Sequence, residues 1–188
     1  MGDRVVRTAR EIGTADAALP LLARAYQLAM EPRLRLGIDD HDPDFLHPGR
    51  TALILLLDTQ ETRPGVLASA MLTETGRSDL RVDAARIEPA LGGVFGAEVR
   101  ERVAAVPLTS DDDLGERLVL AAEDVQLVAL AERLDYLRHA HLWSDVERRR
   151  AAHALAIQVY AGLAQRVHPA LARRYDAWCG IFERKYLR

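Results

Sequence analysis

Residues 45–56, Phe-Leu-His-Pro-Gly-Arg-Thr-Ala-Leu-Ile-Leu-Leu, form an apolar run whose polar residues all lie between His47 and Thr51. Two further apolar runs, residues 67–74 and residues 127–134, also carry polar residues where a buried helix face would otherwise continue. The polar residues that stand out in the three runs are His47, Thr73, Glu74 and Glu132. Helical bundles build sites in their cores from polar side chains on facing helices. The three runs therefore predict a helical bundle with one internal polar site.

The composition predicts an all-α protein with a single domain. Ala, Leu, Arg and Glu dominate the 188 residues, and no alternating run of β-branched residues is present. A chain of this length typically forms one domain and buries a full hydrophobic core. We expect a bundle of about eight helices over residues 14–188, preceded by an N-terminal arm formed by residues 1–13.

Start and stop signals predict the helix boundaries. Residues 4–12 form either a short helix or an extended arm. Thr14 is a good N-cap for the next helix, and Pro32 is expected to end that helix after Met30. Residues 37–43 have the composition of a loop. The remaining helices are expected at residues 47–57, 64–76, 82–91, 96–106, 114–139, 146–167 and 169–186.

The sequence shows no sign of secretion or of membrane insertion. The single Cys179 cannot form an internal disulfide, and the first residues lack the apolar core of a signal peptide. Every apolar run is interrupted well before the roughly 20 residues that span a bilayer. The net charge is -3 with both signs mixed along the chain, which argues against broad nucleic-acid binding. We therefore expect a cytoplasmic protein, with a homo-oligomer as one option for its assembly.

Several motifs, in their order along the chain, resemble those of the HD-domain phosphohydrolases. The closest resemblance is to the small alarmone hydrolases and to the (p)ppGpp hydrolase domain of Rel/SpoT enzymes, and it covers residues 33–184. The motifs are FLHP at 45–48, the apolar helix 67–74, VFGAEV at 94–99, LAERLDYL at 130–137, and the tail helices after Trp143-Ser144. The resemblance implies an HD-type helical bundle. It also implies manganese-dependent removal of pyrophosphate from the 3′ position of guanosine tetra- and pentaphosphate.

The residues that carry the family's chemistry depart from its pattern. The resemblance places metal ligands at His47, Thr73, Glu74 and Glu132, where the family has His, His, Asp and Asp. It places the family's acid pair, which orients the attacking water, at Arg77 and Ser78. It places nucleotide contacts at Arg35, Arg50 and Tyr136, with Arg35 at the position of a base-stacking arginine and Tyr136 at that of an asparagine.

These changes weaken the metal site and its chemistry. A catalytic divalent ion needs several N or O donors that converge around it, and a neutral threonine hydroxyl is a poor donor. His47, Glu74 and Glu132 still make a three-ligand set that suits some first-row metals. Arg77 lies three residues after Glu74, so a helix would let the two pair and would bring a cation close to the metal position. Ser78 lacks the basicity to activate water.

Other interpretations of these residues stay open at this point. His47 is either a metal ligand or a helix-start histidine, and Thr73 and Glu74 are either ligands or residues at a solvated helix end. We favour an ion pair of Glu132 with Arg77 or Arg50. Arg33 and Arg35 fit a solvated charged segment better than a base platform. The acidic loop 39–44 matches no calcium-binding loop.

The sequence therefore supports three hypotheses. The favoured one is a catalytically degenerate HD-domain protein that binds no metal and either binds a guanine nucleotide without hydrolysing it or acts only through a partner. The first alternative is an active phosphohydrolase that uses Mn²⁺ and acts on (p)ppGpp or a related nucleotide. The second alternative is an interaction module whose former pocket is filled by side chains.

Overall fold

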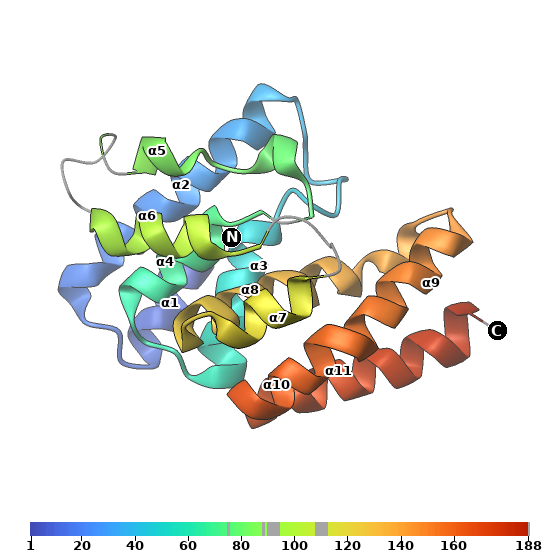
Figure 1. Ribbon diagram of the computed structural model, residues 1–188. Coiled ribbons are helices and arrows are strands. Elements are labelled where there is room, and N and C mark those ends of the chain that lie inside the picture. Colours follow the sequence, from blue (N-terminus) through green and yellow to red (C-terminus); the bar gives the residue numbers. More distant parts are fainter. Residues whose placement is uncertain (75, 88, 90–94, 108–112, 188) are drawn as a thin grey trace.

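Two helices, α3 (His47–Ile54) and α8 (Glu123–Arg138), form the centre of the structure (Figure 1). The computed structural model describes residues 1–74, 76–87, 89, 95–107 and 113–187. Every residue of α8 from Leu127 to Asp135 is buried, so this helix is covered on all sides rather than along one stripe. A helix in this position carries its polar residues into the interior of the bundle.

The N-terminal half of the chain packs around these two helices. It contains α1 (Gly2–Glu11), α2 (Leu19–Arg35) and α4 (Pro64–Leu72). Helix α4 contacts α2, α3 and α8, and all its residues from Val66 onward are buried. Helix α1 packs against α2 and α3 through Val5 and Ala9, which belong to the main hydrophobic core. Residues 1–13 therefore lie on the bundle of their own chain.

The C-terminal part of the chain, from Val146 onward, forms an antiparallel pair against α8, seen in orange and red in Figure 1. One arm consists of α9 (Val146–Leu155), a π-helical segment (Ala156–Ala161) and α10 (Gly162–Val167), and the other contains α11 (Pro169–Phe182). The rings of Tyr160 and Tyr175 stack between the arms, and the Tyr175 hydroxyl donates a hydrogen bond of 2.8 Å to the Leu130 carbonyl. This bond fixes the pair to the central helix.

Shorter helices complete the structure. They are α5 (Ala84–Ile87), α6 (Gly96–Ala105) and α7 (Leu114–Leu120), and α6 packs against α4, α5 and α8. Within the described ranges, 3₁₀ turns lie at Asp16–Ala18, Ser78–Leu80 and Ala140–Leu142, and a π-helical segment, Leu55–Thr59, extends α3. Among the described residues there is no β-strand, and no helix is both long and apolar enough to cross a membrane.

The all-α, single-domain prediction is confirmed, with about ten helices among the described residues rather than about eight. One difference is that the helix expected at residues 114–139 is two helices, because the backbone is extended at Ala121 and Ala122. The helix expected at 82–91 is described only over Ala84–Ile87, since residues 88, 90 and 91 lie outside the described part. The helix expected to reach Gly76 ends at Leu72.

The prediction for the first long helix was wrong at both ends. Thr14 does not cap it, because a 3₁₀ turn at Asp16–Ala18 comes first and α2 begins at Leu19. Pro32 lies inside α2, which continues to Arg35. Proline usually ends a helix because it lacks an N–H and its ring crowds the preceding turn. Here the helix continues for less than one turn past Pro32, and this turn brings Arg33 into the protein interior.

Candidate functional site

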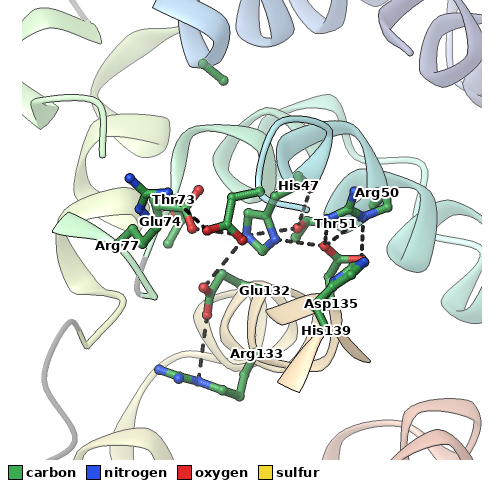
Figure 2. A network of polar contacts seen from close by, with 12 residues as sticks. His47, Arg50, Thr51, Thr73, Glu74, Arg77, Glu132, Arg133, Asp135 and His139 are labelled. Carbon is green, nitrogen blue, oxygen red and sulfur yellow. Dashed lines mark hydrogen bonds and ion pairs between the residues drawn. The ribbon is translucent and has the colours of Figure 1, made fainter. Parts of the chain in front are cut away.

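His47 is the centre of a buried polar cluster that joins α3, α4 and α8 (Figure 2). It is the first residue of α3, and Pro48 follows in the first turn, where its missing N–H costs little. The side chain is 1% exposed. Its Nδ1 lies 2.8 Å from Asp135 Oδ2, and its Nε2 lies 3.6 Å from Glu74 Oε1 and 3.8 Å from Glu132 Oε1. One imidazole therefore contacts or faces three carboxylates.

Asp135 holds the imidazole in place. An ionised carboxylate only accepts hydrogen bonds, so the Nδ1–H of His47 is the donor in this pair. Arg50, one turn further along α3, donates from Nε to both Asp135 oxygens at 3.0 Å, and its Nη2 donates to the Pro43 carbonyl. Asp135 is completely buried. With Nδ1 committed to this carboxylate, Nε2 is the ring atom that points toward Glu74 and Glu132.

Sequence reasoning missed Asp135, although a signal was present. Asp135 comes three residues after Glu132, and residues three apart lie on the same face of a helix. A site that used Glu132 would therefore also have Asp135 on the same side of α8. An aspartate at this spacing, inside an apolar run, was the signal for a second carboxylate in the cluster.

Glu74 is paired with Arg33 from α2. The sequence analysis did not predict this pair. The Arg33 Nη2 donates to Glu74 Oε2 at 2.5 Å, and the Arg33 side chain is 1% exposed. The same guanidinium donates to the carbonyls of Asp44 and Ala29, at 2.9 and 3.0 Å. The prediction of a solvated Arg33 was therefore wrong, because three acceptors inside the protein replace water. The second oxygen, Glu74 Oε1, has no hydrogen-bond partner among the described residues.

Glu132 faces His47 on one side and Arg133 on the other, with 4.0 Å between Glu132 Oε2 and Arg133 Nε. Arg133 is itself buried, and its guanidinium lies over the rings of Tyr136 and Tyr160. The predicted ion pair of Glu132 with Arg77 or Arg50 was therefore wrong, because both arginines have other partners. Arg50 pairs with Asp135 instead, and Arg77 pairs with other acidic residues.

The residues at the remaining family positions turn away from the cluster. The Thr73 hydroxyl donates to the Ser69 carbonyl at 2.9 Å, within its own helix end. Arg77 donates to Asp79 at 2.9 Å and lies 3.4 Å from Asp44, so it does not pair with Glu74 as the helical spacing suggested. The physical reason is that α4 ends at Leu72, which removes the helical geometry that would bring residues 74 and 77 together. Ser78 is exposed.

The electrostatics of the cluster follow from burial and from opposite charges. Burial alone would lower the pKa of His47, but Glu74, Asp135 and Glu132 outweigh burial and raise it from 6.5 to about 9. Burial alone would raise the pKa of Asp135, but the hydrogen bonds from His47 and Arg50 bring it down to about 2. Burial raises the pKa of Glu74, against the attraction of His47 and Arg33. At neutral pH, His47 is therefore cationic and Asp135 is anionic.

Tyr136 packs against Gly76, two residues after Glu74. A Cβ atom added to Gly76 would lie 2.5 Å from the Tyr136 ring, so the ring and the Gly76 backbone are in direct contact. The ring is held from the other side by Trp143, at a centroid distance of 5.1 Å. Its hydroxyl accepts a hydrogen bond of 2.7 Å from Arg148. Tyr136 therefore acts as a packed side chain here.

The three residues at the predicted nucleotide-contact positions lie in different surroundings. Arg35 is exposed at the C-terminal end of α2. Arg50 is bound to Asp135 and lines a pocket beside α1, whereas Tyr136 lines a different pocket beside α9. The structure thus does not gather these three side chains around one cavity.

The cluster fits a metal ion in part. One ligand atom from each of His47, Glu74 and Glu132 lies within 4.8 Å of the others, and Glu74 Oε1 lacks a hydrogen-bond donor. A carboxylate on the far nitrogen of the histidine, as Asp135 provides, is the usual support of a metal-binding imidazole. However, Arg33 already neutralises Glu74, and Thr73 offers no fourth donor. The three side chains could hold a first-row divalent ion, in competition with a proton on His47.

No protein-family model, no curated protein and no solved structure matches this chain. The resemblance to HD-domain phosphohydrolases therefore stays a prediction from the sequence.

Proposed function

We propose that this chain is a catalytically degenerate HD-domain protein of the alarmone-hydrolase type, in which the former metal ligands form an internal ion-pair network. The observation that carries this proposal is that each carboxylate of the cluster has its own arginine. Glu74 lies within 4.0 Å of Arg33, as Glu132 does of Arg133 and Asp135 of Arg50. A nearby guanidinium offsets part of the desolvation cost of each buried carboxylate, which is the role that a bound cation would otherwise have.

Access to the cluster also supports a silent site. The side chains of His47, Glu74 and Glu132 are only 1–2% exposed. A phosphate group must reach a hydrolytic metal and its water at close range for the reaction to take place. Arg77 and Ser78 supply no carboxylate to orient that water. The proposal includes a capacity to bind a guanine nucleotide at the surface, without hydrolysis.

One alternative is a metal-dependent phosphohydrolase acting on (p)ppGpp or a related nucleotide. The observation in its favour is the convergence of His47, Glu74 and Glu132, together with the unpartnered Glu74 Oε1. When bound, Mn²⁺ would supply an activated water at neutral pH. His47, Glu74 and Glu132 would hold the ion, and Asp135 would orient the imidazole.

A second alternative is an interaction module with a filled pocket. The contact between Tyr136 and Gly76 favours it, since this ring packs against the chain two residues after Glu74. A module of this kind would bind neither a metal at the cluster nor a nucleotide at the surface.

A turnover assay with Mn²⁺ and guanosine tetraphosphate tests the proposal. We expect no release of pyrophosphate above that of the His47→Asn variant, in protein stripped of metal and then supplied with Mn²⁺. Manganese-dependent release that is lost in His47→Asn would establish the hydrolase instead.

A thermal-shift measurement with guanosine tetraphosphate separates the remaining possibilities. A ligand that binds only the native state must raise the melting temperature, and the rise grows with ligand concentration. A rise without turnover is the result expected for a silent binder. The absence of any rise would favour the interaction module.

A further inference from the structure

A basic pocket that Arg50 helps to line lies where segments from four helices meet. It has a volume of about 280 Å³. Its arginines come from α1, α3, α8 and α11, and they are Arg4, Arg50, Arg138 and Arg174. Among the described residues, no acidic one lines the pocket. Four segments that are distant in the sequence thus bring their guanidinium groups to one concave surface.

The charges around this pocket are not matched. Asp135 contacts Arg50 and lies 3.9 Å from Arg138, and Asp58 accepts two hydrogen bonds from Arg174, at 2.9 and 3.0 Å. Within the part of the chain that the structure describes, Arg4 forms no ion pair and no side-chain hydrogen bond. Two carboxylates therefore oppose four guanidinium groups, which leaves an excess of two positive charges next to the pocket.

Donor groups on these arginines remain available. Arg50 uses Nε and Nη2 for Asp135 and Pro43, and Arg174 uses Nε and Nη2 for Asp58. The Nη1 atoms of both residues make no hydrogen bond to the described residues. A guanidinium that is held by a carboxylate on one edge keeps its other edge oriented, so less entropy is lost when that edge binds an anion.

The remaining wall of the pocket is apolar. It is formed by Met1, Leu53, Ile54 and Leu57. Leu57 is 50% exposed although it belongs to an otherwise buried run of leucines. A cavity of this volume lies at the lower end of the range for small-molecule sites, so it suits a ligand of few heavy atoms.

We infer that this pocket binds a small phosphomonoester whose phosphate is attached to a short apolar or aromatic group. The doubly charged phosphate matches the excess of two positive charges, and its oxygens accept from arginine edges in the planar geometry that guanidinium groups favour. The apolar group contacts Leu53, Ile54 and Leu57. The inference about this pocket does not depend on whether the buried cluster binds a metal ion, so it is independent of the proposed function.

Isothermal titration calorimetry of phenyl phosphate with the full chain at low salt tests this inference. We expect saturable binding with a dissociation constant of about 1 mM, which weakens as salt is added. Inorganic phosphate should bind several-fold more weakly, because it lacks the apolar group, and benzyl alcohol should show no binding. Equal affinity for phenyl phosphate and inorganic phosphate would overturn the role of the apolar wall.

Variants locate the site. Arg4→Gln and Arg138→Gln should each weaken phenyl phosphate binding roughly threefold to tenfold, since each removes one exposed cation from the pocket. Arg7→Gln on α1 and Arg173→Gln on α11 are the matched controls, because they remove the same charge from exposed positions that do not line the pocket. Leu57→Gln should weaken the binding of phenyl phosphate but not that of inorganic phosphate. The inference fails if phenyl phosphate does not bind, or if the pocket variants and the controls have the same effect.

Discussion

The buried cluster around His47 and the basic pocket beside Arg50 use the same side-chain types in opposite ways. In the cluster, each carboxylate has an arginine within 4.0 Å, and the side chains of His47, Glu74 and Glu132 are at most 2% exposed. Four arginines line the pocket, only two carboxylates outside its lining pair with them, and Arg138 and Arg174 are about half exposed. Arg50 belongs to both regions, because its Nε contacts Asp135 while its side chain lines the pocket.

This difference distinguishes charges that stabilise the structure from charges that are available to a ligand. A buried ion must have a partner, because its desolvation costs several kcal/mol. An exposed cation keeps its hydration and needs no partner, so an unmatched group of cations can persist at the surface until an anion binds. We therefore expect substitutions in the cluster to change stability, and substitutions in the pocket to change binding.

The largest expected effect on stability is that of Arg33→Met, which removes the only arginine paired with buried Glu74 among the described residues and leaves it facing His47 alone. We expect a loss of about 3–5 kcal/mol in the free energy of unfolding, measured with urea. Arg35→Met is the matched control, since Arg35 lies on the same helix and is exposed, and it should change stability by less than about 0.5 kcal/mol. Equal effects of the two variants would mean that burial does not distinguish these arginines.

A pH titration of stability follows from the raised pKa of His47. The folded-state pKa of about 9 lies above the ordinary 6.5, so protonated His47 stabilises the fold fully below pH 6.5. This contribution, about 3 kcal/mol, is lost as the pH rises from 6.5 to 9. Urea unfolding at a series of pH values should show this decline in metal-free protein, and His47→Asn should abolish it.

Repeating the pH series of urea unfolding with added Mn²⁺ tests whether the cluster binds a metal ion. Metal binding needs the neutral imidazole, so a bound ion would stabilise the protein more as the pH rises. If Mn²⁺ reverses the decline in stability between pH 6.5 and 9, the cluster is a metal site. Its charges would then bind a ligand, as those of the pocket do, instead of only stabilising the structure. We expect Mn²⁺ to leave the decline unchanged.

Gly76→Ala tests whether the Tyr136 ring packs tightly against Gly76. The added methyl group would lie 2.5 Å from a ring that Trp143 and Arg148 hold in place. We expect a loss of about 1–3 kcal/mol, measured by chemical denaturation. The same substitution in a Tyr136→Ala background should cost much less, and an equal cost in both backgrounds would show that the ring is not the obstacle.

The smallest expected effect is that of Arg138→Gln in the pocket. Arg138 is 49% exposed and lies 3.9 Å from Asp135, a separation too long for a hydrogen bond, and Asp135 already has His47 and Arg50 as closer partners. We expect a change below about 0.5 kcal/mol in unfolding free energy, together with the loss of phosphomonoester affinity described above. A large loss of stability would show that the pocket arginines belong to the structural network.

The sequence predicted the helical class and the meeting of three polar side chains, because both depend on local patterns. Apolar runs with helical spacing define α3, α4 and α8, and a polar residue inside such a run must lie in the core wherever the helix is covered. His47, Glu74 and Glu132 do lie together. Their role as metal ligands stays a prediction.

The partners of these residues were harder to predict, since each depends on where a helix ends. Arg33 follows Leu22, Ala25 and Ala29 at helical spacing, so it lies on the buried face of α2. The expectation that Pro32 would stop the helix concealed this pattern. Arg77 shows the opposite error, because a helix assumed to continue past Leu72 placed it beside Glu74.

The contact between Tyr136 and Gly76 sets a condition for any attempt to engineer hydrolysis into this chain. Histidine at position 73 and acidic residues at 77 and 78 would introduce the residue types that the sequence resemblance predicts for these positions, yet the Tyr136 ring would still pack against Gly76. A designer would have to shorten residue 136 first, and Arg148 and Trp143 would then lose the group that they hold. A new activity would thus require the aromatic packing next to α9 to be rebuilt, in addition to the polar residues.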